Sequence, residues 1–314
     1  VCLMVVFHVA LCYMAYAPEW WYTVDKGDPQ FSFTMLVMWA DIFIMPVMFF
    51  ISGYFGLMSL VKQTDGRFWK SKLVRIIIPW IAGVVILAPP VTFIMFASRG
   101  IPMDYVHDYL FKLFLFGPCF SHVQYWYLGL LTYLYILLYV FCKLKPDFRK
   151  QLPASIPGAK LFVGFTILSF ACTVGGYMYA GGNNDLWTFI WPVLVFQPSR
   201  VLLYPLYFFL GAYAWRHQWF TQGGYKADPT KWLPAFIVTS VAYLFYCIIG
   251  AQTAASMEQY MIVKAAIHVL FVLSAVFGLL AIFQSQLDYT NKFLGELAAN
   301  SYNMYYTHMG LVML

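Results

Sequence analysis

Apolar segments of membrane-spanning length recur along the whole chain. The segment 31–61 holds a single charged residue, Asp41. A helix needs about 20 mostly apolar residues to cross about 30 Å of hydrocarbon. By this measure the sequence predicts nine candidate spans, some of them short: 1–17, 31–61, 73–97, 125–142, 161–180, 201–215, 233–250, 261–284 and 295–314.

Charged residues are too few to cover a water-exposed surface. They make up 10% of the 314 residues, whereas a soluble domain contains about a quarter. We therefore predict an all-α, polytopic transmembrane bundle and exclude a soluble enzyme or a secreted disulfide scaffold. Residues 1–314 form one membrane-embedded domain in this interpretation. We expect it to be clipped at both ends, because each terminus lies within an apolar run.

Two segments between the candidate spans are amphipathic. We expect segments 101–118 and 186–197 to be interfacial or re-entrant, because their tryptophan and tyrosine residues suit the headgroup region. The six cysteines form no CxxC pair and show no spacing with histidine that indicates a metal site. The sequence therefore predicts neither a metal nor a disulfide.

Basic residues are concentrated on one side of the predicted spans. Fourteen of the nineteen Lys and Arg residues lie in the connections 62–75, 143–160, 216–231 and 285–293. The other five are Lys26, Arg99, Lys112, Arg200 and Lys264. The positive-inside rule then places the N-terminal side in the cytoplasm. Basic residues scattered over short connections form no continuous groove, which excludes a nucleic-acid partner.

Two ionisable side chains are expected at one depth in the bilayer. His8 lies nine residues before Ala17, and Asp41 lies ten residues into the next segment. At 1.5 Å per residue, both lie about 15 Å below the outer end. Such a pair orients a histidine and raises its basicity. The alternative is that His8 is a satisfied core histidine and that Asp41 bonds another helix.

Other polar residues are weaker candidates for contact with a substrate. His308 lies deep in the last segment, with Tyr305 one turn before it on roughly the same face. The alternative, a polar patch that joins helices, is favoured over a catalytic role for these residues. His122 lies in the predicted outward loop 98–124, and Trp126 lies beside it. For His122 the alternative to a substrate contact is a solvated position on the surface.

The segment 67–75 is basic and directly precedes an apolar helix. Lys72 and Arg75 are three residues apart, so they share one helix face at the membrane surface. They are either a topology signal or a cradle for the phosphates of a nucleotide-bearing donor. Charge alone does not distinguish these two roles.

Several strings in the chain, taken in order, resemble the integral-membrane acyltransferase-3 family. They are FH at 7–8, DIFIMPVMFFISGYF at 41–55, KLVRIIIPW at 72–80, HVQYWYLGLL at 122–131 and SYNMYYTH at 301–308. A branch of the family that succinylates periplasmic glucans is similar too.

The resemblance implies about ten spans in the bacterial inner membrane, with an acyl-CoA such as acetyl-CoA or succinyl-CoA as cytoplasmic donor. The acceptor would be a hydroxyl of an envelope carbohydrate or a related molecule. By position, His8 matches the essential histidine of the family and Arg75 the second arginine of its RxxR element. Lys72 replaces the first arginine, so its phosphate contact would be a point charge. A further family arginine would precede Val1.

The resulting hypothesis is a membrane O-acyltransferase. His8 would be the general base, with Asp41 steadying the imidazolium, or His8 would itself carry the acyl group transiently. Lys72 and Arg75 would bind the donor, whereas His122, Trp126, Tyr305 and His308 would contact the substrate. Two alternatives are a secondary transporter or flippase that uses the same His and Asp as a proton relay, and a non-catalytic membrane scaffold. The sequence does not indicate an oligomeric state.

Overall fold

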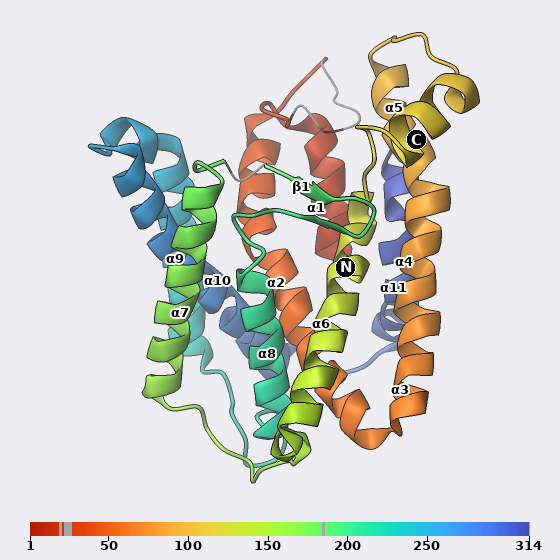
Figure 1. Cartoon of the computed structure of the whole chain (residues 1–314). Helices are drawn as coiled ribbons and strands as arrows, with labels where there is room; N and C mark the ends of the chain where they lie inside the picture. Colours follow the sequence, from red (N-terminus) through yellow and green to blue (C-terminus); the bar gives the residue numbers. More distant parts are fainter. Residues whose placement is uncertain (19–20, 22–26, 184–185, 314) are drawn as a thin grey trace.

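The computed structural model describes residues 1–18, 21, 27–183 and 186–313 and is almost entirely helical (Figure 1). Its longer helices are α1 (Cys2–Tyr13), α2 (Phe31–Lys62), α6 (Trp126–Leu144), α7 (Ala159–Tyr179), α8 (Leu203–Arg216), α9 (Pro229–Thr253), α10 (Met257–Gln286) and α11 (Lys292–Val312). A further helical stretch consists of α3 (Asp65–Lys72), η1 (Leu73–Ile77), α4 (Ile78–Ala82), η2 (Gly83–Leu87) and α5 (Ala88–Ser98). The short elements are η3 (Tyr105–Leu115), η4 (Val123–Tyr125), η5 (Pro146–Arg149), β1 (Thr188–Ile190) and β2 (Leu194–Phe196).

The structure confirms an all-α membrane bundle but not the number of spans. Each of the nine predicted segments overlaps a helix. In the described part of the chain, six helices are long and apolar enough to cross a membrane. Helices α1 and α8 have only 12 and 14 residues, and polar side chains such as Lys292 and Glu296 interrupt the start of α11. The predicted count of nine to ten is therefore not confirmed.

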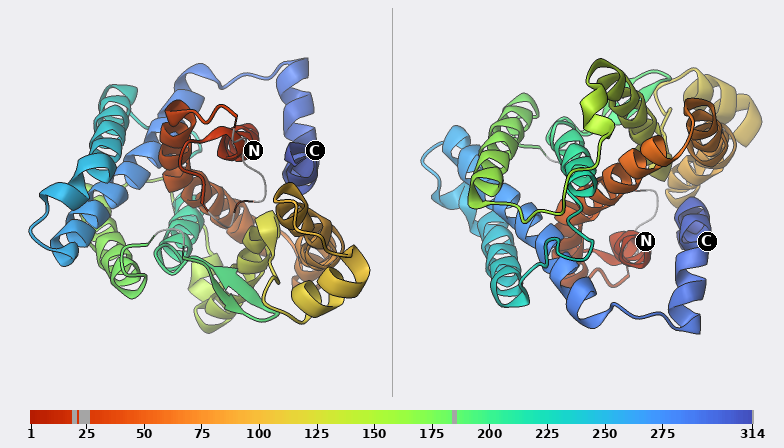
Figure 2. Two further views of the ribbon diagram at one scale, coloured as in Figure 1. Left: turned by 90° about the horizontal axis from the view of Figure 1, so that it is seen from above. Right: turned by 90° about the horizontal axis from the view of Figure 1, so that it is seen from below.

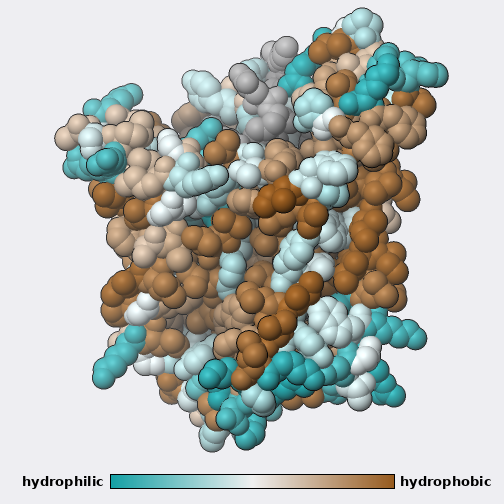
Figure 3. Space-filling model, viewed as in Figure 1, coloured by the Kyte–Doolittle hydropathy of each residue, from teal (hydrophilic) through white to brown (hydrophobic). Residues whose placement is uncertain are grey.

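The surface has an apolar band between two polar ends, as a membrane-embedded bundle requires (Figure 3). The basic connections that follow α2, α6 and α8 lie together at the lower end of the view in Figure 1. This grouping agrees with the charge bias in the sequence, although Lys26 lies outside the described residues. Which end faces the cytoplasm remains a prediction.

Helix α2 runs through the bundle and packs along α8, whereas α10 packs along α9 and α7 (Figures 1 and 2). The α2–α8 contact is close because a glycine from each helix lies at it. A Cβ atom on Gly53 would overlap the carbonyl oxygen of Phe208, and one on Gly211 would overlap that of Phe50. Small residues let helix backbones approach one another in this way within membranes.

Tyrosines of α11 join this helix to the irregular helical stretch 65–98. The backbone carbonyl of Arg75 belongs to the π-helical segment η1, which directly precedes α4 and its Pro79. The hydroxyl of Tyr302 donates to this carbonyl at 2.8 Å, and that of Tyr306 donates to the carbonyl of Pro79 at 3.1 Å. These two hydrogen bonds tie α11 to the helical stretch 65–98.

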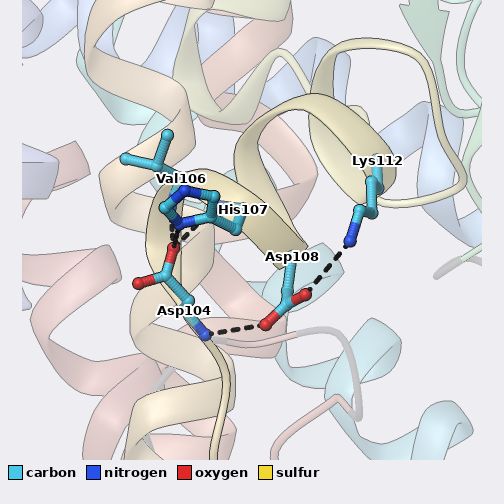
Figure 4. Close-up of polar contacts among 5 residues, drawn as sticks. All are labelled: Asp104, Val106, His107, Asp108 and Lys112. Atoms are coloured by element: carbon cyan, nitrogen blue, oxygen red, sulfur yellow. Dashed lines mark hydrogen bonds and ion pairs between the residues drawn. The ribbon is translucent and has the colours of Figure 1, made fainter.

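The two amphipathic segments adopt different structures. Segment 186–197 contains a β-hairpin in which β1 and β2 pair antiparallel. Segment 101–118 contains the π-helix η3, which is capped by Asp104 (Figure 4). The carboxylate of Asp104 accepts from the backbone N–H of His107 at 2.6 Å and lies 2.8 Å from its Nδ1. These hydrogen bonds lower the pKa of Asp104. His107 itself is 84% exposed, so it is a surface residue.

Candidate active site

A cavity of about 510 Å³ lies at the end of the bundle opposite the basic connections. Its walls come from α1, α2, α5, η3, α6, α8 and α11, and from the segments 118–124 and 186–197. Much of the lining is aromatic: Trp21, Tyr109, Trp126, Tyr127, Trp187 and Tyr204. The volume is in the range of small-molecule sites, and the lining is mainly apolar with a few polar groups.

His8 lines this cavity from α1. Its Nδ1 lies 3.0 Å from the carbonyl oxygen of Met4, one turn earlier. The indole of Trp21 stacks on the imidazole, with 5.8 Å between the ring centroids. Among the described residues, Nε2 of His8 has no hydrogen-bond partner. The imidazole therefore keeps one nitrogen available in a cavity that admits a ligand.

His308 contacts His8 from α11. Its Nε2 lies 3.0 Å from Nδ1 of His8, and its own Nδ1 lies 2.7 Å from the carbonyl oxygen of Tyr305. His308 is 97% buried and is not among the residues that line the cavity. It therefore supports the imidazole of His8 from behind, a position that differs from the substrate contact expected of it.

His8 and Asp41 do not pair with each other as predicted: His8 contacts His308, and Asp41 contacts Arg200. Asp41 lines the same cavity as His8, as their matched depths predict. Its carboxylate, however, forms an ion pair with Arg200, with 2.5 Å between Oδ2 and Nη2. Arg200 also donates to the backbone carbonyl of Asp41 at 3.2 Å. Asp41 is therefore not the orienting partner of His8, because a buried guanidinium already holds its carboxylate.

Three further candidates occupy distinct positions around the cavity. Trp126 and Tyr305 line it, and the hydroxyl of Tyr305 donates to the carbonyl of Gln124 at 2.7 Å. His122 does not line the cavity. Its Nε2 lies 3.2 Å from the carbonyl of Pro192 in the hairpin. Burial lowers the pKa of His122 to about 4, so the ring is neutral near pH 7.

The acyltransferase-3 family, described as an acyltransferase domain, matches residues 1–314. The chain belongs to this family. It is also similar to proteins named glucans biosynthesis protein C. Those of Salmonella heidelberg (strain SL476) and Salmonella schwarzengrund (strain CVM19633) are each 25% identical to it over 222 residues. The aligned part covers 67% of this chain and 54% of each relative, so the chain spans about half the length of the curated relatives it matches. No solved structure matches the chain.

In this acyltransferase-3 chain Lys72 and Arg75, here called the basic element, do not line the cavity. The ammonium of Lys72 lies 4.0 Å from the ring centroid of Tyr135, and the side chain of Arg75 is exposed. Tyr302 contacts the backbone of Arg75 and lies on the same helix as His308. The two residues are six positions apart, which corresponds to about 9 Å along the helix axis.

Sequence reasoning missed two polar residues of the site, Arg200 and Gln124. Arg200 was counted only as a charge in an outward loop, yet it is 98% buried. An intramembrane carboxylate such as Asp41 is costly unless it is paired, and this cost was the available signal for a cationic partner. Gln124 lines the cavity, and no hydrogen bond to its Oε1 is made within the described ranges. No feature of the sequence marked it out.

Proposed function

We propose that this acyltransferase-3 member transfers an acyl group from a cytoplasmic acyl-CoA to a hydroxyl of an envelope carbohydrate or a related acceptor. One observation carries this proposal: the free Nε2 of His8 is at the wall of a cavity that can hold a small molecule. Family membership supports a membrane acyltransferase. The donor, the acceptor, the bacterial inner membrane and a cytoplasmic N-terminal side are parts of the proposal.

The base is the first requirement of this chemistry. A hydroxyl has a pKa far above 7, so it must lose its proton as its oxygen attacks the thioester carbonyl. Nε2 of His8 takes that proton, the C–O bond forms and the C–S bond breaks. The departing sulfur then receives the proton from Nε2, so the products are an ester and free coenzyme A. A positioned base contributes about 10²- to 10⁴-fold to such a reaction.

The lining of the cavity is consistent with a carbohydrate acceptor. Trp126 and Trp187 meet edge to face, with 5.7 Å between their ring centroids and 69° between the ring planes. Flat aromatic faces suit the apolar C–H faces of a sugar ring, whereas Gln124 and Asp41 offer acceptors for its hydroxyl groups. The names of the relatives refer to glucans, which supports the same class of acceptor.

The donor is assigned to the basic element at the opposite end. We expect the double variant Lys72→Ala, Arg75→Ala to raise the apparent KM for the acyl-CoA about tenfold or more, because each lost phosphate contact removes a charge-assisted hydrogen bond. The KM for the acceptor should stay unchanged. Steady-state kinetics with varied donor measure both values, and the exposed Lys150→Ala, Lys231→Ala pair is the control. An unchanged KM for the acyl-CoA would contradict donor binding by Lys72 and Arg75 and would indicate that they serve only as a topology signal.

The proposed reaction is tested directly with purified protein in proteoliposomes. Radiolabelled acetyl-CoA and succinyl-CoA are supplied on one side and candidate glucans on the other. Covalent label in the glucan, with release of free coenzyme A, is the expected result. Counterflow of unmodified glucan without acylation would instead support the transporter or flippase. Labelling only from a donor other than an acyl-CoA would overturn the donor assignment while keeping the transferase.

A further inference from the structure

We propose that His308 is a positioning residue that holds the proton of His8 on Nδ1 and thereby keeps Nε2 of His8 free as the base. The inference rests on the proposed function, since it gives a role to a residue behind the reacting group. It also replaces Asp41 as the orienting group. The two rings are tilted by 45° with centroids 4.9 Å apart, and they are joined at 3.0 Å between Nε2 of His308 and Nδ1 of His8.

The direction of each hydrogen bond follows from the backbone carbonyl of Tyr305, which lies behind His308 as His308 lies behind His8. A carbonyl oxygen can only accept. Nδ1 of His308 lies 2.7 Å from the carbonyl of Tyr305 and 3.2 Å from that of Met304, so this nitrogen carries a proton. In a neutral imidazole the other nitrogen is then an acceptor. Nε2 of His308 therefore faces His8 with its lone pair.

The same reasoning assigns the proton on His8. Both partners of its Nδ1, the carbonyl of Met4 and Nε2 of His308, are acceptors. Nδ1 must therefore donate, and in the neutral ring Nε2 carries no proton. The tautomer with a basic Nε2 at the cavity wall is the one that the surrounding groups select. A histidine whose other nitrogen is held in this way has its reactive tautomer set in advance.

The pair also stabilises the charge that forms during the reaction. When Nε2 of His8 takes a proton from the acceptor hydroxyl, His8 becomes an imidazolium. Its Nδ1–H then makes a charge-assisted hydrogen bond to His308, which is stronger than the neutral one. Asp41 cannot supply this stabilisation directly, because Arg200 holds its carboxylate. His308 thus takes the place that the sequence had assigned to an acidic residue.

The kinetic test compares two substitutions at one position. His308→Leu removes the acceptor, and we expect kcat to fall by about 10²-fold, at the lower end of what a general base contributes. Both KM values should be unchanged, because His308 does not line the cavity. His308→Gln places an amide oxygen within reach of His8 and should recover most of the activity. The exposed His107→Gln is the matched control. A kcat for His308→Leu equal to that of the parent would overturn the proposal.

A second measurement reads the proton directly and needs no substrate. Solid-state NMR of ¹⁵N-histidine-labelled protein in bilayers distinguishes protonated from unprotonated ring nitrogens, with the His8 signals assigned by their loss in His8→Ala. We expect a protonated Nδ1 and an unprotonated Nε2 in the parent, and a populated Nε2–H form in His308→Leu. A protonated Nε2 in the parent would refute the inference even if acyl transfer occurs. The expected tautomer in an inactive protein would instead refute the proposed function alone.

Discussion

Replacing His8 with alanine is expected to lower kcat by about 10²- to 10⁴-fold, the range that a positioned general base contributes. The physical reason is that no other described nitrogen base lines the cavity with a free lone pair. Acyl transfer to the acceptor, measured with labelled donor in proteoliposomes, gives the rate. The KM for the donor should change little, since the basic element lies outside this cavity.

Folding must be shown to survive in the His8→Ala variant. Size-exclusion profile and thermal unfolding in detergent should match those of the parent, because the substitution removes a ring that already borders an open cavity. His107→Gln again provides the control for the loss of an imidazole, since His107 is a surface residue. Unaltered transfer by a folded His8→Ala protein would remove His8 from the mechanism.

Adding one methyl group at Gly53 is expected to have the largest effect on stability. The new Cβ atom would overlap the backbone of Phe208, which cannot move aside as a flexible side chain does. Helices α2 and α8 would have to separate, and overpacking of this kind costs about 1–3 kcal/mol or more. Gly211→Ala should act in the same way from the other helix, because its Cβ atom would overlap the backbone of Phe50.

A matched glycine separates this packing effect from helix propensity. Gly164 lies within α7, and no atom lies within 4 Å of a Cβ atom built on it. Gly164→Ala should therefore leave stability unchanged or raise it slightly, since alanine favours helices over glycine by about 1 kcal/mol. Thermal unfolding in detergent micelles compares the three variants. Equal stability of Gly53→Ala and Gly164→Ala would contradict the prediction, because it would show that α2 and α8 can accommodate a methyl group between their backbones.

The positions of the helices followed from local sequence, and the number of spans did not. Apolar runs are a property of consecutive residues, so each predicted segment overlaps a helix. Whether a helix can cross the membrane depends also on its length and on the polar residues within it. For this reason α1, α8 and α11 are not among the six described helices that are long and apolar enough to cross a membrane. The hairpin in segment 186–197 was not anticipated, because aromatic content predicts a position at the interface but no particular backbone structure.

The depth of the site was predictable, and the partners within it were not. Counting residues along two neighbouring helices placed His8 and Asp41 at one level, and both do line one cavity. The same count says nothing about rotation around each helix axis or about groups far away in the chain. Arg200 reaches Asp41 across 159 residues, and His308 reaches His8 across 300.

The sequence by itself therefore determined the class of the protein, its family and the level of its polar site. These depend on hydrophobicity and on short motifs, which are local properties of the chain. The tertiary structure alone decided that a second histidine, and not a carboxylate, supports the candidate base. Hydrogen-bond partners depend on distances and directions of about 1 Å precision, and only the packing of α11 against α1 and α4 sets them.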